Sequence, residues 1–104
     1  MNYVDTVGPL LDAGTADRLA ETFRALADPT RLRILSALTD RECSVGGLAD
    51  ALGMTHSAVS HQLGLLRRMR LVRARRAGRR VFYTLDDEHI RDLFQQGLEH
   101  VQHT

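Results

Sequence analysis

The stretch Met54–Arg70 constrains the fold more than any other part of the chain, because it predicts a helix with two chemically different faces. Thr55 precedes the helix and is placed to cap its first turn with a hydroxyl. Val59, Leu63 and Leu66 recur at helical spacing and form an apolar stripe. The opposite face carries short hydrogen-bonding side chains toward its start and arginine toward its end. Short donors and acceptors suit base edges, and arginine suits phosphates.

The residues before this helix predict a helix-turn-helix motif. Ser44 is placed to cap a short helix through Leu52, and Gly53 ends that helix in the left-handed conformation that glycine allows. Two helices joined by a tight glycine-containing turn are typical of this motif, whose second helix lies in the major groove of DNA. The side chains expected to contact DNA from this helix are Thr55, His56, Ser57, Ser60, His61, Gln62 and Arg67.

A β-hairpin is predicted after Arg70, where the hydrophobic period changes from 3.6 to 2. The expected strands are Leu71–Arg76 and Arg80–Leu85, with Gly78 in the turn between them. Eight arginines fall within residues 67–80, a segment that contains no acid. So dense a run indicates a polyanionic partner, although a solvated arginine-rich hairpin is the alternative. A hairpin directly after a recognition helix is a wing that contacts phosphates or the minor groove. The arginines expected to supply charge are Arg75, Arg76, Arg79 and Arg80.

The rest of the chain is expected to form one small domain that is mainly helical. Residues 1–14 are expected to be a flexible N-terminal arm, and residues 15–104 to form the DNA-binding and dimerisation domain, with further helices over Thr15–Ala27 and Pro29–Leu38. No apolar run approaches the ~20 residues of a membrane span, and no signal peptide is visible at the N-terminus. A cytoplasmic location is therefore expected. The single cysteine, Cys43, fits a reducing compartment.

The last helix, expected over Asp87–Gln102, carries an apolar stripe at helical spacing. No later element is expected to cover this stripe. A terminal amphipathic helix in a small chain often packs against its symmetry mate, so a homodimer is expected. The residues of the stripe are Ile90, Leu93, Phe94, Leu98 and Val101.

Three of the five histidines lie in or just after this helix. His100 and His103 share one face, whereas His89 lies eleven residues, or roughly 16 Å, before His100. Two antiparallel copies of the helix bring the start of one beside the end of the other. Each such site then has three imidazoles and one carboxylate, a set suited to tetrahedral Zn²⁺, with Co²⁺ as a substitute. Asp87 is the expected oxygen ligand, and Asp86, Glu88 and Glu99 are the alternatives. Exposed histidines without a ligand role are the competing interpretation.

The segments ADPTRLRIL, LADALGMTHSAVSHQL and GRRVFYTLDDEH resemble the ArsR/SmtB family of bacterial metal-sensing repressors. The resemblance runs from about residue 20 to the C-terminus. It implies a winged-helix homodimer that binds operator DNA when metal-free and is released by metal. The zinc-sensing branch is similar in having Asp-x-His at the start of the last helix and His-x-x-His near its end. Those positions match Asp87, His89, His100 and His103.

The sequence departs from other branches of that family. Arsenic, cadmium and lead sensors use Cys-x-Cys before the recognition helix, where this chain has Cys43 alone. Nickel and cobalt sensors add terminal histidines, and the N-terminal segment here has none, so Zn²⁺ is expected with Co²⁺ or Ni²⁺ as alternatives. A winged-helix regulator that senses Cys43 oxidation or a small ligand is the second interpretation. A zinc hydrolase is disfavoured, because four ligands fill the metal and no nucleophile–base pair appears.

Overall fold

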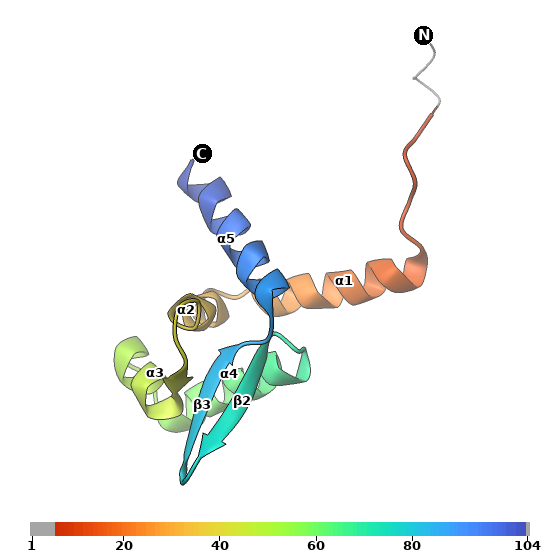
Figure 1. Cartoon of the computed structure of the whole chain (residues 1–104). Helices are drawn as coiled ribbons and strands as arrows, with labels where there is room; N and C mark the ends of the chain where they lie inside the picture. Colours follow the sequence, from red (N-terminus) through yellow and green to blue (C-terminus); the bar gives the residue numbers. More distant parts are fainter. Residues whose placement is uncertain (1–5, 104) are drawn as a thin grey trace.

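The computed structural model describes residues 6–103 of the chain. Its elements are α1 (Ala13–Leu26), α2 (Pro29–Ala37), β1 (Cys43–Ser44), α3 (Val45–Leu52), α4 (His56–Arg68), β2 (Val72–Ala77), β3 (Arg80–Leu85) and α5 (Glu88–Gln102). The predicted class, mainly helical with a small hairpin, is confirmed. Helices α3 and α4 form the helix-turn-helix, and the β2–β3 hairpin projects from the helices as the wing (Figure 1).

The helix-turn-helix forms through the predicted local signals. The Ser44 hydroxyl accepts the Gly47 N–H at 3.0 Å and caps α3. Gly53 ends α3 with φ 65°, a left-handed conformation that costs glycine little. The Thr55 hydroxyl then accepts the Ala58 N–H at 3.0 Å and caps α4. Each signal lies within three residues of the group it satisfies, which is why the sequence predicts this motif well.

Helix α4 is shorter than the predicted Met54–Arg70. At its start, the Met54 N–H donates to Ala49 O at 3.0 Å and so belongs to the end of α3. At its end, Arg70 adopts φ 58°, and the Leu71 N–H donates to Leu66 O at 2.9 Å. This left-handed residue closes the helix and turns the chain into β2.

The sheet has three antiparallel strands in the order β1-β3-β2, one more than the hairpin predicted. Strand β1 pairs Cys43 with Tyr83 and Ser44 with Phe82. Two residues are too short to show an alternating pattern, so this strand was not predicted. Strands β2 and β3 pair from Val72–Leu85 to Ala77–Arg80 around a two-residue turn that begins at Gly78, with φ 63°. Strand β2 therefore extends one residue beyond its predicted end at Arg76.

The core lies between α2, α3, α4 and the base of the wing. The predicted stripe of α4 is confirmed, since Val59, Leu63 and Leu66 are fully buried. The remaining buried apolar residues are Ile34, Leu35, Leu38, Leu48, Ala49, Leu71, Val72 and Leu85. Neither α1 nor α5 has a buried residue, and both extend away from this core (Figure 1). None of the described helices is long and apolar enough to cross a bilayer.

The N-terminal helix begins earlier than expected. Asp12 accepts the Thr15 N–H at 3.0 Å and its hydroxyl at 2.7 Å, so α1 begins at Ala13 rather than at Thr15. Of the predicted arm, residues 1–5 lie outside the described residues, as does Thr104, and residues 6–11 form no helix or strand. At the other helices the differences are single residues: α2 ends at Ala37, and α5 begins after Asp87, which is its cap.

The cap of the recognition helix yields a stability prediction. Thr55→Ala is expected to lower the free energy of unfolding by about 1 kcal/mol, because the Ala58 N–H loses its hydrogen-bond acceptor. Thr55→Ser retains the hydroxyl and is expected to unfold like the wild type. Urea unfolding followed by circular dichroism at one protein concentration measures both. Equal stability of the alanine and serine variants would contradict the assigned cap.

Candidate DNA-binding surface and metal ligands

The exposed face of α4 carries three of the predicted DNA-contacting side chains. Ser57, Ser60 and His61 are exposed. At 100° per residue Ser57 and His61 lie opposite to the buried stripe, and Ser60 lies on the flank, about 90° from it. Thr55 and Arg67 are also exposed, at the two ends of the helix. The packing of α4 thus presents hydroxyls and an imidazole to solvent along one continuous face.

His56 lies beside the first helix of the motif. A Cβ at Gly46 would lie 3.4 Å from the Cε1 atom of His56, so the imidazole ring packs against the start of α3. His56 is nevertheless exposed to solvent. The ring therefore sits at the junction of the two helices of the motif rather than on the outer face of α4.

Gln62 is half-buried and turned toward α2. Its Oε1 atom accepts a hydrogen bond of 3.5 Å from Nη1 of Arg31. Arg31 also donates from Nε to Ala25 O at 2.6 Å and from Nη2 to Arg24 O at 3.2 Å. One guanidinium thus satisfies carbonyls at the end of α1 and contacts the recognition helix. The sequence analysis missed this role of Arg31, and no local pattern signals a contact 31 residues along the chain.

The four wing arginines differ in their surroundings. Arg75 forms a two-point ion pair with Glu42, with Nε 3.1 Å from Oε2 and Nη2 bonded to Oε1. This guanidinium holds the pKa of the Glu42 carboxyl below its usual value, and Glu42 raises the pKa of Arg75. Arg80 donates to the Ser44 hydroxyl at 3.4 Å. Arg76 and Arg79 are exposed, and their side chains make no hydrogen bond or ion pair within residues 6–103.

The predicted metal ligands occupy the two ends of α5. At its start, Asp87 Oδ1 accepts the Ile90 N–H at 3.1 Å, and Oδ2 lies 3.5 Å from Nδ1 of His89. The Ile90 hydrogen bond, together with His89, keeps the pKa of the Asp87 carboxyl below its usual value. The carboxylate is therefore charged near neutral pH, as a metal ligand must be. The structure brings Asp87 and His89 together on one side of the helix start.

At the other end of α5, His100 and His103 line a shallow hollow with Gln96 and Glu99. The Nδ1 atom of His103 lies 2.9 Å from Glu99 O. In a neutral imidazole, a ring nitrogen that donates to a carbonyl carries the proton, and Nε2 then has a free lone pair. Metal-ligating histidines usually donate their second nitrogen in this way. Within one protomer the described residues bring together no group of three or more histidine, cysteine or acidic side chains suited to a metal.

Cys43 lies away from both pairs, in β1. The residue is half-buried, and its thiol contacts Ala37 O at 3.5 Å. Burial raises the pKa of this thiol, which lowers the fraction of reactive thiolate at neutral pH.

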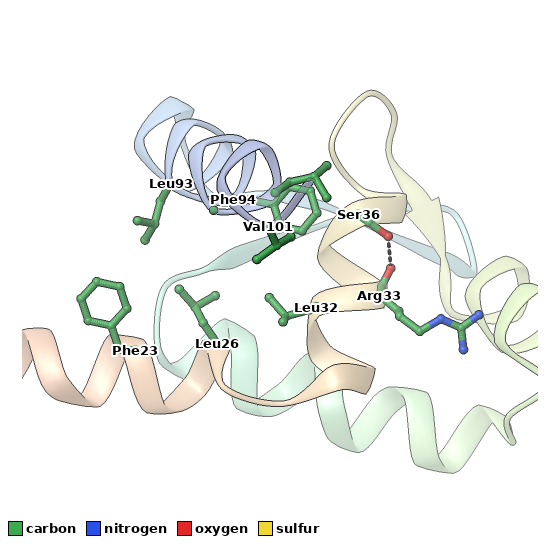
Figure 2. Close-up of a pocket in the computed structure, with 10 residues that line it drawn as sticks. Phe23, Leu26, Leu32, Arg33, Ser36, Leu93, Phe94 and Val101 are labelled. Carbon is green, nitrogen blue, oxygen red and sulfur yellow. Dashed lines mark hydrogen bonds between the residues drawn. The ribbon is translucent and has the colours of Figure 1, made fainter. Parts of the chain in front are cut away.

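An apolar cavity of about 460 Å³ opens between α1, α2 and α5. Phe23, Leu26 and Leu32 point into it from α1 and α2, across from Leu93 of α5 (Figure 2). Phe23 is 49% exposed and Leu32 is 39% exposed, although both carry large apolar side chains. Such a face is unusual for a surface that remains in water.

Known proteins resemble this chain in sequence. The sequence pattern of the bacterial regulatory protein, arsR family, matches residues 28–74. A transcriptional repressor SmtB homolog from Synechocystis sp. is 51% identical over 84% of this chain, which spans 66% of that protein. The HTH-type transcriptional regulator NmtR of Mycobacterium tuberculosis is 45% identical over 89% of this chain and 78% of its own length.

Solved structures of related proteins have the same fold as this chain. The solution structure of apo-NmtR superposes with a TM-score of 0.79 at 40% identity, covering 100% of this chain and 87% of that one. The homodimeric winged helix-turn-helix DNA-binding domain Mb0332 of Mycobacterium bovis gives a TM-score of 0.81 at 33% identity, covering 92% and 91%. The relatives named here are regulators rather than enzymes. The chain belongs to the ArsR family of bacterial transcriptional regulators.

Proposed function

We propose that this protein is a metal-responsive transcriptional repressor. As a metal-free homodimer in the cytoplasm it binds operator DNA, and it leaves the DNA when Zn²⁺, with Co²⁺ or Ni²⁺ as alternatives, occupies sites between the two α5 helices. Asp87 and His89 of one protomer and His100 and His103 of the second would hold the ion. Four such donors suit a closed tetrahedral zinc site.

The observation that carries this proposal is the division of the ligands along α5. His89 and His100 are eleven residues apart on one straight helix, which separates them by roughly 16 Å. Each end supplies two donors, and two antiparallel helices would complete two equivalent sites by symmetry. Two hydrogen bonds support the proposal, because each orients a metal-ligating side chain before any metal binds. Asp87 accepts the Ile90 N–H as the cap of α5, and the His103 ring contacts the Glu99 carbonyl.

The apolar face supports a second copy as the partner of α1 and α5. Helices α1 and α5 bury no residue in one protomer, and Phe23 and Leu32 remain exposed beside the 460 Å³ cavity. Covering this face with another chain of the same sequence removes apolar surface from water. The related Mb0332 domain is described as homodimeric.

The DNA would meet α4 and the tip of the wing. In a two-fold dimer, two recognition helices enter successive major grooves of an inverted repeat. The exposed side chains of α4 that would face base edges or phosphates are Ser57, Ser60 and His61. On the wing, the exposed Arg76 and Arg79 would contact the flanking phosphates. The ligand pairs and the recognition helices belong to one folded unit. A coupling of about 1–3 kcal/mol between metal and DNA would change the DNA affinity about 5–150-fold.

The dimer interface is tested by Phe23→Glu. Wild type is expected to sediment as a dimer, twice the chain mass of 11.7 kDa, because the apolar face is covered. A glutamate at position 23 places a charge in that face and is expected to yield monomers. Val7→Glu is the matched control, since Val7 is 77% exposed and lies outside the cavity. Analytical ultracentrifugation at several concentrations distinguishes the species. An undiminished dimer for Phe23→Glu would place the interface elsewhere.

The metal response is tested by His100→Ala. Fluorescence anisotropy is measured on a DNA fragment from just upstream of the coding sequence, with and without stoichiometric Zn²⁺. Zinc is expected to weaken wild-type binding about 5–150-fold. His100→Ala is expected to bind DNA with the affinity of metal-free wild type, and zinc is expected to leave that affinity unchanged.

Gln96→Ala is the control for this experiment. Gln96 lines the same hollow as His100 and is not a usual zinc ligand, so this variant is expected to keep the zinc response. Tight binding of wild type that zinc leaves unchanged would contradict the metal response. That result would favour a regulator of another signal, with Cys43 oxidation as the first alternative to examine.

Asp87→Asn separates the two roles of Asp87. Asparagine caps helices as well as aspartate does, so the thermal stability of the metal-free protein is expected to remain near that of wild type. The variant loses the anionic oxygen and is expected to bind zinc about 10-fold or more weakly, measured by competition with a chromophoric chelator. Asp87→Ala is expected to lose both the cap and the ligand. Unchanged zinc affinity in Asp87→Asn would exclude this carboxylate as the ligand.

A further inference from the structure

The middle of the wing contains one row of side chains that crosses all three strands. Phe82 of β3 pairs with Ser44 of β1 on one side and with Arg75 of β2 on the other. Residues in one such row lie on the same face of a sheet and touch one another. Glu42 lies two residues before Ser44, and its carboxylate reaches Arg75. The row therefore connects the wing to the segment that leads into α3.

Two arginines of the wing contact Phe82 of this row: Arg75, which belongs to the row, and Arg80, which pairs with Ala77 nearer the tip. The guanidinium carbon of Arg75 lies 5.3 Å from the centroid of the Phe82 ring, and that of Arg80 lies 4.9 Å from the same centroid. These distances are within the range of cation–π contacts. Arg75 also makes the two-point ion pair with Glu42, and Arg80 reaches the Ser44 hydroxyl. Two parallel hydrogen bonds between a guanidinium and a carboxylate make one of the strong kinds of ion pair in proteins.

The tip arginines are different. Arg79 lies in the turn and Arg76 lies two residues before Gly78. Both are exposed, and their side chains make no hydrogen bond or ion pair in the described part of the chain. Their charge is available to a phosphate without breaking any internal contact. At Arg75, by contrast, the Nε and Nη2 donors are already bonded to Glu42. The carboxylate of Glu42, 37% exposed beside it, would also repel an approaching phosphate.

We propose that Glu42, Arg75 and Phe82 form a clamp that fixes the wing against the helix-turn-helix and removes Arg75 from the phosphate-contacting residues. Glu42 is then a positioning residue, and the tip arginines Arg76 and Arg79 carry the phosphate contacts of the wing. This inference rests on the proposed DNA binding. It assigns different roles to arginines that the sequence makes equivalent.

The clamp links the wing to the recognition unit through one short strand. Glu42 and Ser44 flank Cys43 in or beside β1, and Ser44 is the cap of α3. The hairpin is also tied to the body of the protein at its base, where Val72 and Leu85 are buried, and through Tyr83, which is partly buried against the core. Holding Arg75 and Phe82 against this segment sets the angle at which the tip leaves the helices.

The salt dependence of DNA binding depends on the number of phosphate contacts, so its measurement tests the clamp. Each neutralised phosphate adds about 0.9 to the slope of log affinity against log salt concentration. Arg79→Gln, with two copies per dimer, is expected to reduce the slope by about 1.8, and the affinity ratio between 50 and 200 mM salt by about 12-fold. Arg75→Gln is expected to keep the wild-type slope while weakening binding equally at each salt concentration, because the wing loses its anchor.

Glu42→Gln tests the same clamp from the other side. Removing the carboxylate charge frees Arg75, and the slope is expected to become steeper by up to about 1.8 per dimer. Asp40→Asn is the matched control, because it removes one acidic charge from the same loop while Asp40 faces Arg91 rather than Arg75. Its slope is expected to equal that of wild type. Thermal unfolding of each variant confirms that it is folded before its slope is compared.

The outcomes separate this inference from the function on which it rests. An Arg75→Gln slope reduced as far as that of Arg79→Gln would overturn the clamp, as would a Glu42→Gln slope no steeper than that of Asp40→Asn. In either case wild-type binding to the upstream fragment would leave the DNA-binding proposal intact. Absence of wild-type binding at 50 mM salt would instead remove the proposed function, and the clamp's assignment with it.

Discussion

The burial of one stripe on α4 is the contact on which the rest of the structure depends. Val59, Leu63 and Leu66 are fully removed from solvent and lie in one cluster with α2, α3 and the start of the wing. Because a helix has one such side, the same packing presents Ser57 and His61 to solvent. The surface proposed to meet DNA is therefore a geometric consequence of the core, and its side chains contribute little to stability themselves. They are free to vary with the operator while the stripe is not.

The helices outside that core depend on a different constraint. Helices α1 and α5 have apolar faces but no fully buried residue within one protomer. One side of the protomer therefore leaves apolar side chains exposed to water. The ligand sets are likewise incomplete within one protomer, since the length of α5 keeps Asp87 and His89 apart from His100 and His103. Under the proposed dimer, one docking event would cover the apolar face and complete the ligand sets. Metal affinity, dimer stability and DNA affinity would then be thermodynamically linked, because all three depend on how the two copies sit against each other.

Local signals in the sequence predicted most of the fold. The caps at Ser44 and Thr55 and the left-handed Gly53 each act within three residues, so the helix-turn-helix was predicted, although α4 is two residues shorter at each end than expected. Contacts between distant segments were not predictable in this way. Strand β1 shows no pattern of its own and exists because β3 offers it an edge. Gln62 has the polarity of a DNA contact, yet a guanidinium 31 residues away turns it toward α2. The metal ligands at the two ends of α5 stay a prediction, since one protomer brings together no group of three or more such side chains within the described residues.

The arginines of the wing show why charge in a sequence differs from charge available to a partner. Two guanidinium groups beside one Phe82 ring repel each other, and the Glu42 carboxylate offsets that repulsion at Arg75. Glu42 thus lowers the repulsion among the cations of the hairpin before DNA is present, and the same carboxylate occupies an arginine. At the tip, Arg76 and Arg79 extend into water, where solvent and salt screen their repulsion and no internal partner is required. The number of arginines in such a segment is therefore an upper bound on the phosphates it neutralises. Under the proposed clamp, the ion pair between Arg75 and Glu42 places the number of neutralised phosphates below that bound.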